Sequence, residues 1–284
     1  MQKLKKIILR TLAVLAGLYV LLCTGLYFFQ EKLIFFPTKL EQSYVFNFQK
    51  PFAEITIPTK DNLNLHGVLF YSQNKDSLKN KSKKKLVFYL HGNVGQVQFW
   101  GNLADVYTEL GYDLFILDYR GYGKSKGKIY SQEQFFNDVQ TAYDFVRKTQ
   151  KYDEENIVVV GYSVGTASAA MLASQNTPKS LILQAPYFSL TDMTTRRFPF
   201  VPTFLLKYEF HTAKFLSQNK VPTYIFHGTA DRVIPYESSL MIKEYLENNL
   251  NDKVNKTSFI TLPNQGHANI HSNPIFLKKL KEVL

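Results

Sequence analysis

The chain has 284 residues, of which 45% are hydrophobic and 20% charged, a composition that excludes a largely disordered protein and suits one large globular domain. The formal net charge is +11, but the basic residues gather in two places: four precede the first apolar run, and six lysines fall between residues 75 and 85. No nucleic-acid-binding motif accompanies either cluster, so we expect no nucleic-acid partner. The single cysteine, Cys23, excludes an intrachain disulfide.

The first element along the chain is an apolar run over residues 11–29, with 19 consecutive uncharged residues. At about 1.5 Å per residue, a helix of this length spans the roughly 30 Å hydrocarbon core of a bilayer. The basic residues lie before the run, which predicts a cytoplasmic N-terminus and an extracytoplasmic remainder. A cleaved signal peptide is the alternative, although no typical small-residue cleavage site follows the run. We therefore expect residues 1–29 to form a basic segment and a single-pass membrane anchor.

The next part of the chain is expected to be a connector followed by the main domain. Residues 30–50 predict an amphipathic connector, and residues 51–284 predict one α/β domain. Residues 52–58 and 63–71 alternate apolar and polar side chains, which predicts a β-hairpin. The lysine-rich stretch after the hairpin predicts a solvated loop, of a kind that suits an anionic lipid surface.

Beyond this loop the pattern changes to short, continuously apolar strands, as expected for a sheet that is covered on both faces. The predicted strands are residues 86–90, 114–117, 157–160, 181–183, 223–226 and 258–262. Apolar residues at helical spacing predict a helix over 131–149, begun by a capping box of Ser131 and Gln134. Further helices are expected at 96–110, 164–174, 237–248 and 273–283. This alternation predicts a doubly wound, mostly parallel α/β sheet.

The motif Gly161-Tyr162-Ser163-Val164-Gly165 directly follows the apolar strand 157–160. A G-x-S-x-G turn between a strand and a helix rich in small residues is the setting of a nucleophile elbow. Its glycines leave room for a strained turn that exposes the serine, and the helix behind directs its positive pole at a developing oxyanion. Ser163 is therefore the predicted nucleophile.

A serine hydroxyl needs a base to accept its proton and a carboxylate to orient that base. His267 follows the last predicted strand and is the expected base. Asp231 follows the next-to-last predicted strand and is the expected carboxylate. The weaker alternatives for these two roles are His271, Asp192 and Asp252.

An oxyanion hole needs N–H donors aimed at the reacting oxygen. The backbone amide of Val164 is one predicted donor, and Asn93, in the loop after the strand 86–90, is the other. His91 and His227 each stand before a glycine at a strand end, where we expect them to order a loop.

Residues 121–125 resemble the end of a P-loop. Asp118 stands where the first glycine of that motif would have to be, so no nucleotide site is expected. No histidine, cysteine or acidic residues have the spacing of metal ligands, and no glycine-rich dinucleotide motif opens a helix. The sequence therefore implies no metal and no cofactor.

Taken together, these motifs resemble the α/β-hydrolase superfamily, and most closely its serine-aminopeptidase-like branch of single-domain hydrolases with one N-terminal anchor. The resemblance covers about residues 30–284. It implies the α/β-hydrolase fold and a catalytic triad of Ser163, Asp231 and His267, in the chain order of that superfamily. The segments that carry it are residues 91–93, 118–125, 161–165, 227–231 and 266–267.

Only 36 residues separate Pro186 from Thr223, where larger relatives insert a multi-helix cap. We expect a small apolar lid there, formed by residues 198–202 and 204–206, and an open pocket that favours an ester or acyl-thioester over a peptide. The leading hypothesis is a carboxylesterase or acyl-thioesterase that hydrolyses a small-molecule or acylated substrate. The alternatives are a serine aminopeptidase-type peptidase and a non-catalytic, membrane-tethered binding protein of the same fold.

Overall fold

The structure is a computed structural model that describes residues 1–72, 84–249 and 257–284. In these residues an eight-stranded sheet has the strand order β10-β9-β8-β7-β4-β6-β3-β2. Two short strands, β1 (Phe36–Pro37) and β5 (Val94–Gly95), pair in parallel beside it. Most of the lysine-rich stretch, and Asp252, lie outside the described residues.

The predicted hairpin is confirmed. Strands β2 (Phe52–Pro58) and β3 (Asn64–Phe70) pair antiparallel, with Phe52 opposite Phe70. Strand β3 also pairs antiparallel with β6 (Asp113–Asp118), which joins the hairpin to the rest of the sheet.

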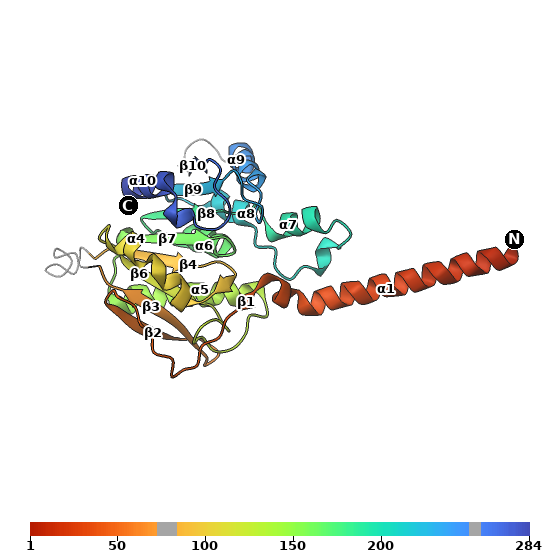
Figure 1. Ribbon diagram of the computed structural model, residues 1–284, viewed down its shortest axis with the longest axis horizontal. Helices are drawn as coiled ribbons and strands as arrows, with labels where there is room; N and C mark the ends of the chain where they lie inside the picture. The colour runs from red at the N-terminus through yellow and green to blue at the C-terminus, as the bar shows by residue number, and fades with distance from the viewer. Residues whose placement is uncertain (73–83, 250–256) are drawn as a thin grey trace.

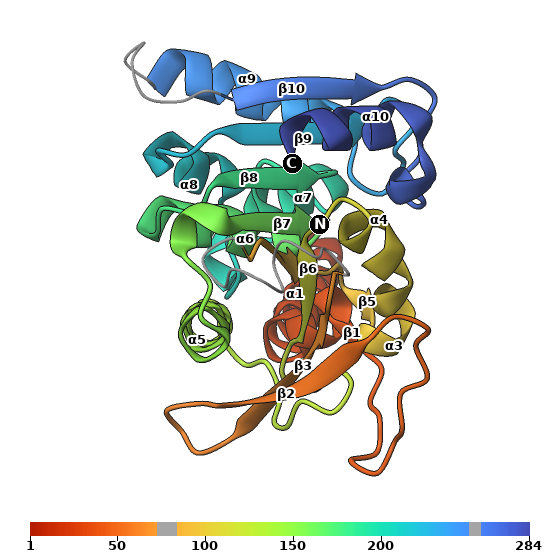
Figure 2. The ribbon, with the colours of Figure 1, turned by 90° about the vertical axis from the view of Figure 1, so that its left-hand side faces the viewer.

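The remaining neighbours in the sheet are parallel, as the apolar runs predicted (Figure 2). Every residue of β4, β6, β7 and β8 is buried, which explains why these strands lack polar alternation. Successive side chains of one strand enter different cores, so Phe88 packs on one face of the sheet and Tyr89 on the other. The bounds of the other parallel strands are β4 (Leu86–Leu90), β7 (Ile157–Tyr162), β8 (Ser180–Gln184), β9 (Thr223–Gly228) and β10 (Thr257–Leu262).

Helices cover both faces of the sheet, which completes the doubly wound α/β architecture (Figure 2). One core includes residues of α5 (Gln132–Gln150), α6 (Gly165–Gln175), α8 (Thr212–Gln218) and α9 (Glu237–Asn249). The opposite core includes residues of α3 (Val97–Trp100), α4 (Ala104–Thr108) and α10 (Pro274–Val283).

Helix α5 begins where the capping box predicted, but only half of that box forms. The Ser131 hydroxyl accepts a hydrogen bond from the Gln134 amide at 3.1 Å. The Gln134 side chain accepts from the amide of Tyr130 at 3.2 Å, one residue before the expected donor. The two bonds together still satisfy two amides at the start of the helix.

The helix expected over 96–110 is found as a helical segment from Val97 to Thr108, but it is not one α-helix. The segment is broken into α3, the 3₁₀ helix η2 (Gly101–Leu103) and α4. The Phe48 ring packs so closely on Gly101 that a Cβ atom there would lie 2.4 Å from it. The contact between Phe48 and Gly101 lies at the change from α-helix to 3₁₀ helix. The local sequence pattern does not predict this change.

Helix α1 (Gln2–Ile34) has 33 residues and projects well beyond the rest of the chain (Figure 1). Among the described residues it is the one helix long and apolar enough to cross a membrane. The helix continues past the apolar run, which ends at residue 29, into residues 30–34 of the expected connector. Gln30 lies in this extension, and its side chain donates to the Leu205 carbonyl at 3.1 Å and accepts from the Lys207 amide at 2.8 Å.

The short segment between β8 and β9 forms a cap of α7 (Leu190–Arg197), the 3₁₀ helix η4 (Thr203–Leu205) and α8. Its apolar residues 198–206 lie against the C-terminal half of α1 (Figure 1). The Tyr19 hydroxyl donates to the Phe200 carbonyl at 2.8 Å, and Lys207 forms an ion pair with Glu31 at 3.0 Å. The cap is therefore built on α1 as well as on the sheet.

Candidate active site

Ser163 lies directly after β7, with a backbone φ of +53° that L-amino acids rarely adopt. Hydrogen bonds on both sides hold this turn. The Ser163 amide donates to the Gln184 carbonyl at 2.9 Å, and the Ser163 carbonyl accepts from the Thr166 amide at 3.0 Å. The strained conformation is thus anchored to β8 on one side and to the first turn of α6 on the other.

The two glycines of the motif have a packing reason to be glycine. A Cβ atom at Gly161 would lie 2.6 Å from the Ala169 Cβ, and one at Gly165 would lie 2.2 Å from the Leu90 carbonyl oxygen. Both distances are far below van der Waals contact. The missing side chains let α6 pack tightly against β4 and β7, directly behind Ser163.

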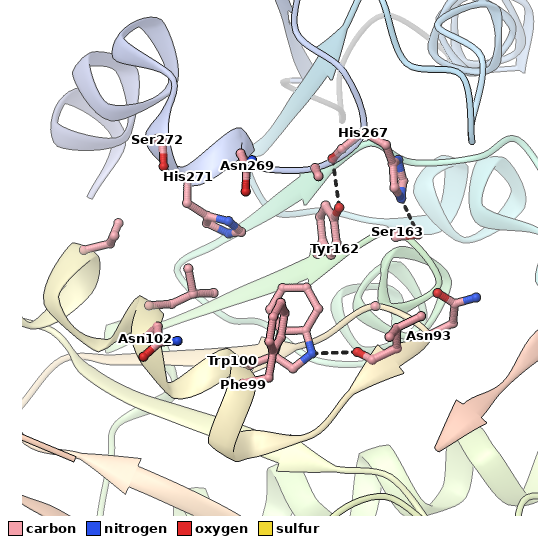
Figure 3. Close-up of a pocket in the computed structure, with 15 residues that line it drawn as sticks. Asn93, Phe99, Trp100, Asn102, Tyr162, Ser163, His267, Asn269, His271 and Ser272 are labelled. Carbon is pink, nitrogen blue, oxygen red and sulfur yellow. Dashed lines mark hydrogen bonds between the residues drawn. The ribbon is translucent and has the colours of Figure 1, made fainter. Parts of the chain in front are cut away.

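The structure brings Ser163, His267 and Asp231 together from the ends of three parallel strands. Figure 3 shows the contact of His267 with Ser163. His267 Nε2 lies 3.1 Å from Ser163 Oγ, and His267 Nδ1 lies 2.7 Å from Asp231 Oδ2. Both distances are within hydrogen-bond range. The arrangement can pass a proton from the serine to the imidazole while the carboxylate fixes the ring orientation.

The surroundings of Asp231 keep its carboxylate charged. Burial by itself raises the pKa of Asp231, but hydrogen bonds from His227 and His267 outweigh it and hold that pKa well below its usual range. The second carboxylate oxygen accepts from the amides of Val233 and Ile234, each at 2.9 Å. Asp231 is thus fixed in one orientation as an anion that faces His267.

The loops that carry Asp231 and His267 are joined by backbone contacts. The Ala230 amide donates to the Gln265 carbonyl at 3.0 Å. A Cβ atom at Gly228 would lie 2.1 Å from the same carbonyl oxygen, so this close approach requires glycine. The ends of β9 and β10 therefore hold the acid and the base at a fixed separation.

Tyr162 is a site residue that sequence reasoning missed. Its hydroxyl donates to the His267 carbonyl at 2.8 Å, and its ring packs on the imidazole with a centroid distance of 5.3 Å (Figure 3). Burial raises the pKa of Tyr162, which keeps the hydroxyl protonated as a donor. The only signal in the sequence is its place beside Ser163 in the G-x-S-x-G motif.

Val164 directly follows Ser163 in the chain, and Asn93 lines the same cavity as Ser163. Within the described residues, neither backbone amide donates a hydrogen bond. The Asn93 carbonyl accepts from the Tyr122 hydroxyl at 2.7 Å and the Phe36 amide at 3.0 Å. The Asn93 side chain donates to the Ile34 carbonyl at 3.2 Å. The side chain and carbonyl of Asn93 are therefore used to position its loop.

A cavity of about 480 Å³ contains Ser163 and His267 (Figure 3). Its walls combine aromatic and aliphatic residues with asparagine, serine and histidine, and among the described residues no aspartate or glutamate lines it. The remaining lining residues are Gly92, Asn93, Val94, Phe99, Trp100, Asn102, Leu103, Val106, Tyr162, Ala268, Asn269, His271 and Ser272.

The alternative site residues do not join Ser163. His271 lines the cavity, but its Nε2 lies 3.1 Å from the Tyr89 hydroxyl, and burial lowers its pKa to about 4. Asp192 lies on α7 and pairs with Arg196 at 2.9 Å. His91 is buried and contacts the carbonyl of Gly92 at 2.6 Å, within its own loop.

Known proteins share parts of this sequence. Residues 81–215 match the family model described as serine aminopeptidase, S33. The chain is 29% identical over 201 residues to the uncharacterized protein YfhR of Salmonella typhi, covering 65% of this chain and just under two thirds, 66%, of that relative. It is 27% identical over 230 residues to the protein bem46 of Schizosaccharomyces pombe, covering 76% and 74%.

Solved structures share the whole fold of the domain. The esterase Pf2001 of Pyrococcus furiosus superposes with a TM-score of 0.66 and 19% identity, covering 87% of this chain and 97% of that one. Est1E of Butyrivibrio proteoclasticus, solved with ferulic acid bound, has a TM-score of 0.61 and 20% identity, covering 80% and 96%. At these identities the likeness establishes the fold. The chain has the α/β-hydrolase fold.

Within this fold, residues 118–125 form a loop that is held by side-chain contacts. Asp118 accepts a hydrogen bond from the Val97 amide at 2.8 Å, and its other oxygen lies 3.2 Å from His66. Gly123 has a φ of +48°, and a Cβ there would collide with the Asp118 carboxylate. Lys124, which stands where a P-loop would have its lysine, pairs with Glu54 at 2.6 Å.

Proposed function

We propose that the protein is a serine hydrolase that cleaves carboxylic esters or thioesters, with Ser163 as nucleophile, His267 as general base and acid, and Asp231 as the orienting carboxylate. The observation that carries the proposal is the continuous chain of contacts from Asp231 through His267 to Ser163, at 2.7 and 3.1 Å. Ser163 is strained and contacts an imidazole that a buried carboxylate orients. The sheet does not need this arrangement for its stability, which supports a catalytic role.

The reaction follows from these contacts. Ser163 Oγ attacks the carbonyl carbon of the substrate while its proton moves to His267 Nε2. The tetrahedral intermediate collapses, the bond to the leaving group breaks, and His267 returns the proton to that group. A water molecule then attacks the acyl-enzyme and gives a proton to His267. Release of the carboxylic acid returns this proton to Ser163.

The oxyanion of the tetrahedral intermediate would lie between the amides of Val164 and Asn93. Both amides are free of intramolecular partners within the described residues, and both adjoin Ser163. The N-terminus of α6 adds a partial positive charge on the same side. Loss of one such donor typically lowers kcat by about 10²- to 10³-fold.

The lining of the active-site cavity favours a neutral ester or thioester over an aminopeptidase substrate. A peptide with a free α-ammonium group calls for an anionic partner near the nucleophile, since an unpaired charge is costly to desolvate. No aspartate or glutamate of the described residues lines this cavity. The name of the Pf2001 structure, an esterase, agrees with this preference.

The test is hydrolysis of a matched panel of esters, acyl-thioesters and aminoacyl amides by the full chain in detergent. We expect esters and thioesters to be cleaved, and Ser163→Ala to abolish the activity while circular dichroism stays unchanged. A folded protein that cleaves none of the substrates would support the non-catalytic binding protein instead. Preferential cleavage of aminoacyl amides would support the peptidase.

We also propose that α1 anchors the domain in a membrane, with the N-terminus cytoplasmic and the hydrolase domain extracytoplasmic. The basic residues before the apolar run and the length of α1 support this organisation. The contacts of Gln30 and Glu31 with the cap favour a retained anchor over a cleaved signal peptide. Protease added to intact cells should digest the domain, and protection of the domain would contradict the orientation.

A further inference from the structure

A second cavity, of about 440 Å³, lies between α1 and the cap, outside the site described above. One wall is the C-terminal half of α1, and the other is α7 with the turn that follows it. The walls are almost entirely apolar. The lining residues are Leu22, Leu26, Tyr27, Gln30, Leu33, Ile34, Leu190, Met193, Thr194, Arg197, Phe198, Phe200, Val201, Leu205, Leu206 and Tyr208.

The buried polar groups in these walls already have partners within the chain. Gln30 donates to the carbonyls of Tyr27 and Leu205, each at 3.1 Å, and accepts from the amide of Lys207. The Thr194 hydroxyl donates to the Leu190 carbonyl at 2.8 Å. The cavity therefore offers a ligand an apolar surface, because the hydrogen bonds of Gln30 and Thr194 are already made within the chain.

The walls of the two cavities are joined by a hydrogen bond, although the cavities share no lining residue. Asn93 lines the active-site cavity, Ile34 lines the apolar one, and the Asn93 side chain donates to the Ile34 carbonyl at 3.2 Å. A substrate that occupied both cavities would pass beside this contact.

From this arrangement we infer that the apolar cavity holds the acyl chain of the substrate, so that the substrate class is long-chain acyl esters or thioesters. The inference rests on the proposed function and sharpens it. The helix that forms one wall is also the candidate membrane span, so an acyl chain leaving a bilayer along α1 reaches the cavity without crossing water. A flexible hydrocarbon chain suits a narrow apolar space whose polar groups are satisfied.

The test compares kcat/KM for p-nitrophenyl esters from butyrate to palmitate, with the full chain in detergent. Each methylene buried in the cavity should raise kcat/KM by about fourfold until the cavity is full. Met193→Trp adds bulk to the cavity wall and should lower the palmitate-to-butyrate ratio by about tenfold or more. Leu240→Trp places the same side chain on the exposed surface of α9 and should leave the ratio unchanged.

A second measurement does not depend on hydrolysis. Palmitic acid with a terminal diazirine is photo-crosslinked to Ser163→Ala protein, and the modified peptides are mapped by mass spectrometry. Adducts within residues 22–34 and 190–208, reduced in the Met193→Trp background, are the expected result.

The outcomes separate this inference from the proposed function. If Ser163 reacts and short esters are cleaved but chain length has no effect, or Met193→Trp leaves the chain-length profile intact, the acyl cavity is refuted and the hydrolase stands. If no ester is cleaved, the hydrolase proposal fails. Crosslinking spread along the chain without preference for these two segments would then refute the cavity as well.

Discussion

The amide of Phe36 donates a hydrogen bond to the carbonyl of Asn93 across 3.0 Å, and this bond joins the exit of α1 to the loop beside Ser163. The pairing of β1 with β5 and the bond from Asn93 to Ile34 strengthen the same junction. The proposed oxyanion donor is therefore positioned by the residues that immediately follow the candidate membrane helix.

The first prediction concerns Asn93. Because its backbone amide is the proposed donor, Asn93→Ala should keep the oxyanion contact and lose only the side-chain bond to Ile34. We expect kcat/KM for an ester to fall by about tenfold or less, with a loss of about 1 kcal/mol in the free energy of unfolding. A loss of activity as complete as that of Ser163→Ala would show that the side chain, not the backbone, makes the essential contact.

The second prediction concerns the orienting carboxylate. Asp231→Asn removes the charge that stabilises protonated His267 and favours the wrong imidazole tautomer, so kcat should fall by about 10⁴-fold, as for the equivalent change in a serine-protease triad. Asp105→Asn is the matched control, since Asp105 is an exposed partner of Lys50. Similar activities of the two variants would contradict the role of Asp231.

The third prediction concerns His271 and pH. Burial lowers the pKa of His271 to about 4 from an ordinary value of 6.5, so the unfolded chain takes up this proton at a higher pH than the folded one. The neutral form therefore stabilises the fold fully above pH 6.5, and this contribution is lost as pH falls toward 4.

We expect the free energy of unfolding of the wild type to fall by about 3 kcal/mol more than that of His271→Gln between these limits. Urea titrations at several pH values measure this difference. Glutamine does not titrate and can still accept a bond from the Tyr89 hydroxyl. Parallel pH profiles for the two proteins would show that His271 does not titrate as its burial requires.

The fourth prediction concerns the glycine behind the elbow. Gly165→Ala forces a Cβ to within 2.2 Å of the Leu90 carbonyl, a backbone atom that cannot turn aside, and should cost about 3 kcal/mol or more of stability. At Gly266 the nearest atom to a new Cβ would be 3.9 Å away, so Gly266→Ala should be tolerated. Thermal melts distinguish the two, and equal melting temperatures would contradict this packing.

The elements that local patterns specify were predictable from the sequence. The buried strands read as apolar runs because both faces of the sheet are covered, and helix α5 follows its apolar spacing and its serine cap. The proposed site residues also lie where the motifs predicted, because strand ends are fixed by the topology of the sheet.

What the sequence did not reveal depends on contacts between distant residues. The helical segment over 96–110 changes type at Gly101, which meets Phe48. Gln30, in the part of α1 beyond the apolar run, bonds to the cap. Tyr162 joins the site through His267, 105 residues further along the chain. Such contacts form only in the folded chain, so the apolar–polar pattern of the sequence does not predict them.

The central claim is that Ser163 is an activated nucleophile, and the most direct measurement is its reaction with a fluorophosphonate. We expect intact-mass analysis of the full chain to show one adduct, located by peptide mapping on Ser163. The adduct should be absent from Ser163→Ala and formed much more slowly in His267→Ala. A folded wild-type chain that takes up no fluorophosphonate, or takes it up equally without His267, would contradict the account.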